Sequence, residues 1–281
     1  MGALVTALLA QDEVVFRSNS NFIAVDAQVL AGEIAVTGLQ RGDFRVWDNG
    51  LPQTISSFGT EDQELDVLLM IDISQSTGMI QESIKQTAAA AMAELLPRDR
   101  LGIVVFADEP FVATAPTTDR AAIEAALSKL PPGRGGTELN ATVRLAAKYL
   151  QQKARPGARR AIVMLSDNLG YQGVSDQEVL AELWASNTVF NLLQFPGKGG
   201  RGKADTREFA KATGGEVVLY RTSGVPLAEL FRRLRQRYYF LYTAPASKSG
   251  ERHQIRVEVA DSAKRRFPKA KVRARSGYVA E

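Results

Sequence analysis

Apolar runs of strand length alternate with helical patterns through the middle of the chain. The helical patterns show apolar residues at helical spacing, with caps or prolines at their ends. Strands are predicted at residues 65–71, 101–107, 111–115, 161–165, 189–195 and 216–220. Helices are predicted at residues 78–96, 119–130, 137–153, 175–184, 206–212 and 226–236. This alternation predicts an α/β fold with a doubly wound, mostly parallel six-stranded sheet, in which 111–115 is the antiparallel exception.

The two chain ends show the period-2 alternation of β-strands instead. Residues 20–59 predict strands and a hairpin that turns at Asp48, Asn49 and Gly50, and the C-terminal end predicts further strands. Neither end is long enough to bury its own core, so we expect both to fold together as one small antiparallel β-sandwich. The predicted organisation is a leader at 1–16, the β-sandwich at 17–62 and 238–281, and the inserted α/β domain at 63–237.

Composition narrows the classes of function. The 281-residue chain has no cysteine, which excludes disulfides, zinc-thiolate sites and thiol catalysis. Its longest apolar runs are strand-length, so no transmembrane segment is expected. The net charge of +4 arises mainly from basic runs at 231–237 and 264–275. We interpret these runs as solvated faces and expect no nucleic-acid partner. The oligomeric state stays open.

The first residues, MGALVTALLAQ, resemble the tail of a secretory signal peptide. They are apolar, rich in small residues and end before a polar turn, but they lack a basic beginning. We therefore expect an exported protein, periplasmic, cell-surface or secreted, whose N-terminal signal is incomplete. The alternative is that this stretch is a plain first strand or helix.

Oxygen-bearing side chains follow the first strand of the α/β unit. Asp72, Ser74 and Ser76 share one side of an extended segment, and a carboxylate with two hydroxyls suits Mg²⁺, Mn²⁺ or Ca²⁺. Thr137 follows a glycine-rich turn and Asp167 follows the next central strand, so we expect both to converge on Asp72. Helix capping would explain Ser76, but neither Thr137 nor Asp167.

This set resembles the metal-ion-dependent adhesion site of von Willebrand factor A-type domains, whose fold is Rossmann-like. The resemblance covers residues 64–237 and rests on DISQS at 72–76, GGT ending at Thr137 and LSDN containing Asp167. It implies that Ser74, Ser76 and Thr137 bind Mg²⁺ or Mn²⁺ directly, while Asp72 and Asp167 act through bound waters. It also implies a non-enzymatic protein-binding module that captures an Asp or Glu of a partner at the open position of the ion.

The flanking sequences resemble a narrower group, the bacterial von Willebrand factor A-related proteins abundant in acidobacteria. The resemblance rests on TGLQRGDFRVWDNGLPQTISSF before the domain and on YYFLYTAP, HQIRVEV and VRARSGY after it. Asn168 is a departure, because related domains usually have glycine there.

Other functions are weighed against this one. A magnesium-dependent aspartyl-phosphate phosphatase would use Asp72 as nucleophile, but Ser74 occupies the place of its second carboxylate. A structural subunit with a purely stabilising ion is the other alternative. The stretch GKGGRGKA at 197–204 resembles a phosphate loop, but Ala204 stands where a hydroxyl must hold magnesium. His253 is interpreted as a polar strand start. The helix at 226–236 is hypothesised to shift when a partner rearranges the metal loops.

Overall fold

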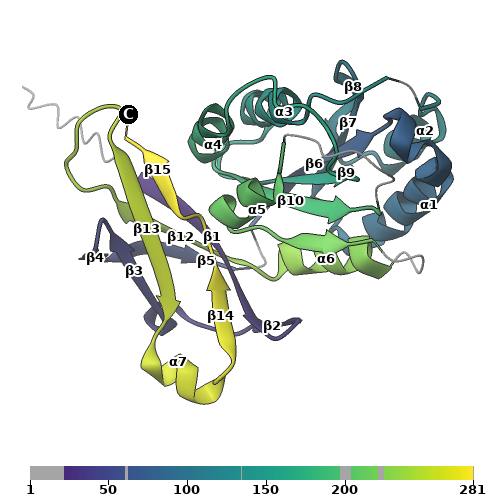
Figure 1. The fold of residues 1–281 in the computed structure, drawn as a ribbon. Coiled ribbons are helices and arrows are strands. Elements are labelled where there is room, and N and C mark those ends of the chain that lie inside the picture. Colours follow the sequence, from purple (N-terminus) through teal and green to yellow (C-terminus); the bar gives the residue numbers. More distant parts are fainter. Residues whose placement is uncertain (1–21, 61–62, 134, 197–203, 221–224, 281) are drawn as a thin grey trace, which may run out of the picture.

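The computed structural model consists of an α/β unit beside a group of strands from the two chain ends (Figure 1). It describes residues 22–60, 63–133, 135–196, 204–220 and 225–280. The predicted leader at 1–16 and the glycine-rich stretch at 197–203 lie outside the described residues. Within the described part of the chain, no helix is long and apolar enough to cross a membrane.

The α/β unit contains the predicted six-stranded sheet. Its strands follow the order β11-β10-β9-β6-β7-β8, and every pair is parallel except β7 with β8. The bounds are β6 (Leu65–Asp72), β7 (Arg100–Phe106), β8 (Phe111–Thr117), β9 (Arg159–Ser166), β10 (Thr188–Gln194) and β11 (Val217–Leu219). All eight residues of β6 are buried, as a strand covered on both faces requires.

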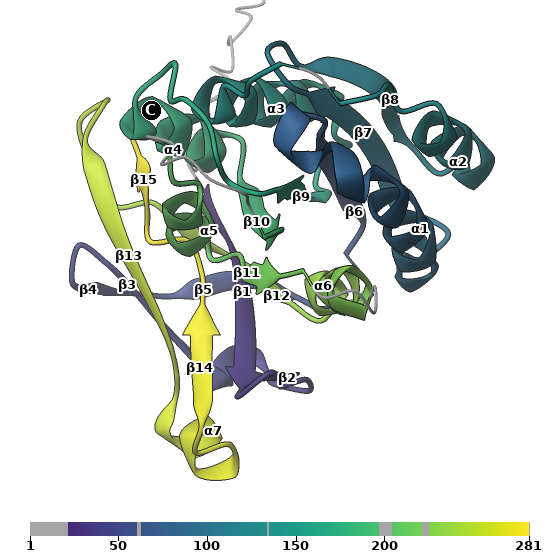
Figure 2. The same cartoon turned by 45° about the vertical axis from the view of Figure 1, so that its right-hand side comes forward.

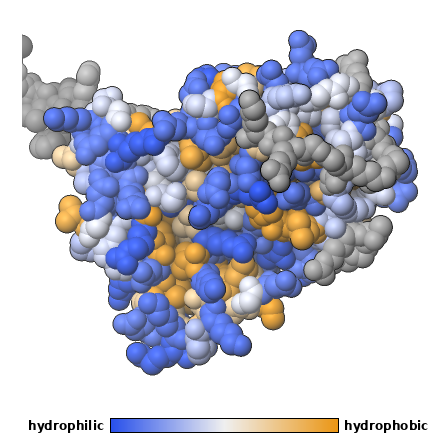
Figure 3. Space-filling model, viewed as in Figure 1, coloured by the Kyte–Doolittle hydropathy of each residue, from blue (hydrophilic) through white to orange (hydrophobic). Residues whose placement is uncertain are grey.

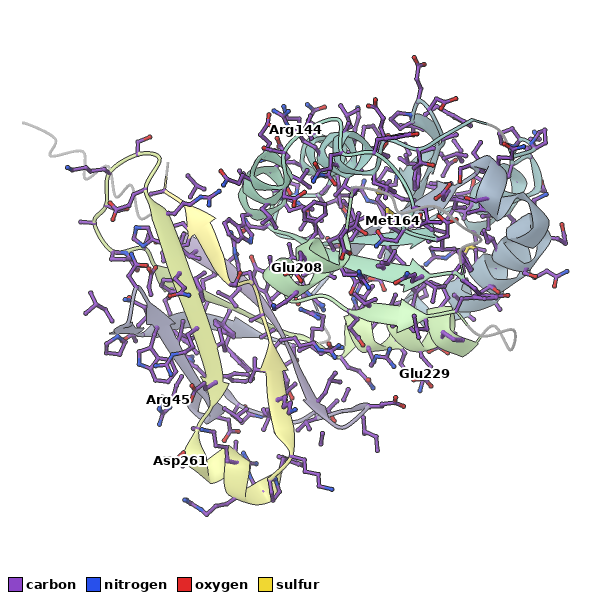
Figure 4. All side chains as sticks on the ribbon, viewed as in Figure 1. Arg45, Arg144, Met164, Glu208, Glu229 and Asp261 are labelled. Atoms are coloured by element: carbon purple, nitrogen blue, oxygen red, sulfur yellow. The ribbon has the colours of Figure 1, made fainter. Side chains whose placement is uncertain are left out.

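Helices cover both faces of this sheet and create two separate cores. On one face lie α1 (Gln81–Ala91), α2 (Arg120–Ser128) and α6 (Val225–Arg235), and on the other α3 (Leu139–Lys153), α4 (Asp176–Ala185) and α5 (Arg207–Thr213). Successive residues of β6 alternate between the cores: Leu69 packs on the α1 side, whereas Leu68 and Met70 pack on the α3 side. Met164 of β9 lies inside the same unit (Figure 4).

One predicted helix differs from the observed elements, and one observed helix was not predicted. Residues 78–96 form no single helix, because 3₁₀ turns at Gln75–Ile80 and Met92–Glu94 flank α1. The first turn is tight because Thr77 Oγ1 donates back to the carbonyl oxygens of Asp72 and Ser74, at 2.9 Å each. A short helix, α7 (Asp261–Arg266), was not predicted, because six residues are too few to show helical periodicity.

The strands from the two chain ends pair with one another in two antiparallel sheets. One sheet contains β1 (Phe22–Ala31), β2 (Ile34–Ala35), β5 (Ile55–Gly59), β12 (Tyr238–Thr243) and β14 (Ala270–Arg273). The other contains β3 (Phe44–Asp48), β4 (Leu51–Gln53), β13 (Arg252–Val259) and β15 (Gly277–Val279). The predicted hairpin joins β3 to β4, where Asn49 and Gly50 have φ of 47° and 81°, as a type I′ turn requires.

A buried polar cluster corrects the interpretation of His253 as a plain polar strand start. His253 is 6% exposed, and its Nδ1 lies 2.6 Å from Asp48 Oδ1. Asp48 Oδ2 also accepts hydrogen bonds from the hydroxyls of Tyr242 and Tyr278, both at 2.8 Å. The histidine therefore helps to satisfy a buried carboxylate between strands of the two chain ends.

Asp26 of β1 joins the chain-end strands to the α/β unit. Its carboxylate accepts from Arg159 Nε at 2.7 Å and from Arg237 Nε. Both arginine side chains are 1% exposed, and Arg159 also donates to the carbonyl oxygen of Leu234 at the end of α6. Burial by itself raises the pKa of Asp26, but the charges of Arg159 and Arg237 outweigh burial and lower the pKa below its usual value.

We expect Asp26→Asn to lower the free energy of unfolding by about 3 to 5 kcal/mol at neutral pH, because two buried guanidinium groups lose their counterion. In the native chain, the lowered pKa gives stability that is present above the unfolded-state pKa of about 3.9. That stability is lost as the pH falls through the folded-state pKa. Urea unfolding from acid to neutral pH measures both effects.

Asp261→Asn is the control for this prediction, because the Asp261 side chain is 88% exposed and should matter little. Identical acid profiles for Asp26→Asn and the native chain would contradict the assigned role of Asp26.

Candidate metal centre

The candidate centre lies at the carboxyl ends of β6 and β9, which are parallel neighbours. Ile71 pairs with Leu165, so the next residues, Asp72 and Ser166, lie level at the edge of the sheet. Both are fully buried, and Ser166 Oγ donates to Asp72 Oδ2 at 2.5 Å. This bond orients the carboxylate toward the loops that leave the sheet.

The turn after β6 brings three of the predicted donors together. Ser74 donates its backbone N–H to Asp72 Oδ1 at 2.8 Å, and its Oγ lies 3.1 Å from Ser76 Oγ. Ser74 is 3% exposed, whereas Ser76 is exposed. The turn thus holds one hydroxyl inside and presents the other at the surface.

Thr137 is held beside this turn by its backbone. The N–H of Gln75 donates to the carbonyl of Gly135 at 3.4 Å, and the carbonyl of Thr137 accepts from Tyr171 N at 2.8 Å. Gly136 N donates to Asp108 Oδ1 at 2.7 Å. Gly135 has φ of +68°, and a Cβ there would lie 2.0 Å from Asp108 Oδ2, so this position requires glycine.

Asp167 directly follows β9 and begins the last donor-bearing loop of the centre. Its Oδ1 accepts from Leu169 N at 3.1 Å. The next residue, Asn168, has φ of 59°, a left-handed conformation that asparagine tolerates better than most residues. Asn168 Oδ1 accepts from Thr206 Oγ1 at 2.7 Å, so its side chain also ties the loop to the start of α5.

Two buried oxygens of the predicted set have no hydrogen-bond partner among the described residues. They are Thr137 Oγ1 and Asp167 Oδ2, and both residues are 3% exposed. Buried polar atoms are rarely left unsatisfied, because each costs free energy. Such atoms also occur elsewhere, for example Thr142 Oγ1 of α3. Thr137 Oγ1 and Asp167 Oδ2 differ in that both lie on loops that converge near Asp72, which fits the binding of an oxygen-preferring cation.

The electrostatics of Asp72 point the same way. Burial raises its pKa above the usual value, while hydrogen bonds from Ser166 and Ser74 act in the opposite direction. The nearby negative charge of Asp167 raises it further. Two carboxylates close together in a buried place favour a compensating cation.

The donor chemistry selects among metals. No group of three or more His, Cys, Asp or Glu that could hold a metal occurs among the described residues. The candidate set instead combines three hydroxyls with two carboxylates, hard oxygen ligands that fit Mg²⁺ or Mn²⁺ better than zinc or copper.

The sequence did not predict the supporting roles of three residues. Ser166 orients Asp72, Asp108 holds the glycine turn, and the backbone of Tyr171 holds Thr137. Only Ser166 could have been found from the sequence, because it is a second oxygen-bearing residue next to Asp167 at the end of a predicted strand. Asp108 and Tyr171 lie in the loops at 108–110 and 169–173, which the sequence predicts to surround the metal site. Their contacts join residues distant in sequence, so no local pattern identifies these supporting roles.

Comparison with known proteins identifies the α/β unit. The family model of the von Willebrand factor type A domain matches residues 67–170. No curated protein sequence matches the chain. An aerotolerance-related membrane protein from Bacteroides fragilis is 20% identical, with a TM-score of 0.51 over 63% of this chain and 98% of that chain. At this identity the likeness concerns the fold alone.

Two further solved structures are similar. BatB from Bacteroides thetaiotaomicron is 19% identical, with a TM-score of 0.48 over 63% of this chain and 98% of its own. A von Willebrand factor type A protein from Catenulispora acidiphila is 15% identical, with a TM-score of 0.49 over 88% of this chain and 72% of its own.

We expect Ser166→Ala to lower the free energy of unfolding by about 1 to 3 kcal/mol in EDTA, because the buried Asp72 carboxylate loses a hydrogen-bond donor. Urea unfolding measures the change. Ser128→Ala, which removes an exposed hydroxyl bonded to a helix carbonyl, is the matched control and should change stability less. Equal stabilities of the two variants would contradict the role of Ser166.

Proposed function

This chain carries a von Willebrand factor type A domain, and we propose that the domain binds a protein partner through a divalent cation. Mg²⁺ or Mn²⁺ would be held directly by Ser74, Ser76 and Thr137, and through waters by Asp72 and Asp167. The observation that carries this proposal is that two buried oxygens, Thr137 Oγ1 and Asp167 Oδ2, find no hydrogen-bond partner among the residues that the structure describes. When bound, the cation supplies an open coordination position for a partner's Asp or Glu.

The acidic residues around the site indicate that a cation is needed to bind an acidic ligand. Asp108, Glu109 and Glu138 are exposed on the loops that flank the glycine turn. Without a cation, these carboxylates repel an acidic ligand. A partner carboxylate therefore binds here only when positive charge has been supplied.

Tyr171 is the best candidate for an anchor beside the ion. Its side chain is 67% exposed, and a Cβ built at Gly136 would lie 3.7 Å from its ring. Its backbone also bonds Thr137 and Leu139. Exposed tyrosines are frequent anchors in protein interfaces. The same backbone hydrogen bonds thus hold both Thr137, a proposed metal ligand, and Tyr171, a proposed contact residue.

The hydrogen bonds of Asp72 favour binding over phosphatase chemistry. Ser74 N and Ser166 Oγ engage one carboxylate oxygen each, so the group is restrained rather than free to attack a phosphorus atom. Ser74 also occupies the place of the second carboxylate that such an enzyme needs.

We also propose that the two chain-end sheets pack as a β-sandwich that carries the domain. One buried hydrophobic cluster contains residues of both sheets, including Val29 and Phe240 of one and Val46 and Ile255 of the other. Since the N-terminal sequence predicts export, the proposed partner belongs to the cell envelope or its surroundings.

Thr137→Val separates metal binding from folding. Because Thr137 Oγ1 has no hydrogen-bond partner among the described residues, its isosteric loss should leave the metal-free stability unchanged or raise it by about 1 to 3 kcal/mol. Affinity for Mn²⁺ should fall by about tenfold or more, since losing even an outer-shell metal partner costs this much. Calorimetric titration with Mn²⁺ and thermal unfolding in EDTA measure the two effects.

Thr142→Val is the matched control, because Thr142 Oγ1 is also buried and also has no hydrogen-bond partner in the described part of the chain, but lies within α3. It should behave like Thr137→Val in EDTA and keep native Mn²⁺ affinity. Equal Mn²⁺ affinity of both variants would defeat the proposed site.

Partner capture distinguishes an adhesive ion from a purely stabilising one. We expect the immobilised chain to retain an envelope protein in Mg²⁺ and release it in EDTA. Thr137→Val should lose the capture, and Tyr171→Ala should weaken it by about tenfold or more, as expected for an interface anchor. Thr142→Val should capture normally. If Mg²⁺ raises the melting temperature but does not affect capture, the stabilising alternative holds instead.

A further inference from the structure

β11 leaves one backbone edge of the large sheet free. The carbonyl of Glu216 accepts from Leu192 N, and Tyr220 N donates to the last residue of β10. The backbone groups of the even-numbered residues therefore point toward β10. The N–H and C=O groups of Val217 and Leu219, which alternate with them, point away from it. Within the described part of the chain, no other strand pairs with β11.

The side chains of this edge strand are also incompletely covered. Val217 and Leu219 are 39% and 65% exposed, whereas Val218 packs against the core beneath α6. Exposed edge strands usually carry a charge or a proline that prevents strand addition, but β11 consists only of Val, Val and Leu. Its backbone and side chains are therefore both suited to receive another strand.

In the ribbon, β11 lies near α6, β1 and β14 (Figure 2). Residues of these four elements line a cleft along β11. A hollow of about 590 Å³ lies there, with Leu30, Gly32 and Pro226 among its lining residues. It adjoins a second hollow of about 440 Å³, with which it shares Leu30, Gly32 and Arg273. Hydrophobic residues reach the surface where the two parts of the molecule meet (Figure 3). Glu229 marks the α6 side of the cleft (Figure 4).

The charge of the cleft is unequal along its length. Lys269, Lys271 and Arg273 line the second hollow, and Arg273 has an ion pair with Glu216 at 3.2 Å. The lysines have no acidic partner among the described residues. On the other side, Glu33, Glu216 and Glu229 line the first hollow. Glu216 and Glu229 are both paired with Arg233, whereas Glu33 has no basic partner among the described residues. The end of the cleft near β14 therefore has unmatched positive charge.

We propose that this cleft binds an extended polypeptide segment of a partner, which adds a strand to β11. Its backbone would pair with Val217 and Leu219, its apolar residues would cover their side chains, and an acidic residue would lie near Lys269 and Lys271. The concave site favours a single strand over a second copy of this chain, whose own β11 lies within an identical cleft. This surface is separate from the proposed metal centre and does not require the ion.

Two synthetic peptides test the proposal. Both alternate valine and threonine, and one ends in two glutamates, the other in two lysines. Amide exchange measured by NMR on the full chain should slow at Val217 and Leu219 with the glutamate peptide, equally in Mg²⁺ and EDTA. Protection elsewhere, or loss of binding in EDTA, would overturn the proposal. Concentration-dependent dimerisation that protects Val217 and Leu219 without peptide would also overturn it, in favour of a second copy.

Two variants give independent readouts. Leu219→Lys should weaken the glutamate peptide by about fivefold or more, since it removes an exposed apolar contact. Leu51→Lys on β4, where Leu51 is 60% exposed, should leave binding unchanged. Lys271→Glu should weaken the glutamate peptide and strengthen the lysine peptide, each by about twofold to fivefold, as for exposed ion pairs. An unchanged preference between the peptides in Lys271→Glu would refute the assigned charge contact.

Discussion

The hydrogen bond between Ser166 and Asp72 is the contact on which the rest of the candidate centre depends. A buried carboxylate at the end of β6 needs donors, and β9 supplies one because the parallel register sets Ser166 level with Asp72. The second donor is the backbone N–H of Ser74, which folds the following turn back toward the sheet. This arrangement places the hydroxyls of Ser74 and Ser76 side by side next to Asp72.

The glycine turn and Thr137 are held by hydrogen bonds to their backbone groups rather than by the proposed metal-binding hydroxyl. The Asp108 carboxylate holds the glycine turn, and Tyr171 pairs with the residues on either side of Glu138. Thr137 Oγ1 is consequently positioned without a hydrogen bond of its own to any described residue, and Asp167 is held through its other oxygen, Oδ1. This separation of positioning groups from donor groups is expected of a site that binds an external cation.

The chain-end strands are joined to the α/β unit by charged contacts at the opposite end of β9. Arg159 begins that strand and contacts both Asp26 of β1 and the last turn of α6. A shift of α6 during partner binding, as hypothesised from connectivity, would have to break the contact between Arg159 and Leu234. These contacts favour a fixed relation between the two parts over an easily displaced helix.

The sequence by itself determined the α/β alternation and the six-stranded sheet, and it placed three of the candidate donors in one turn. These are local properties: apolar runs specify buried strands, and Asp72, Ser74 and Ser76 lie within five residues of one another. Only the tertiary structure decided how distant residues meet. It placed His253 in a buried cluster, brought Asp108 to the glycine turn and left the edge of β11 free. Such features depend on which segments become neighbours after folding, and no periodicity along the chain records that.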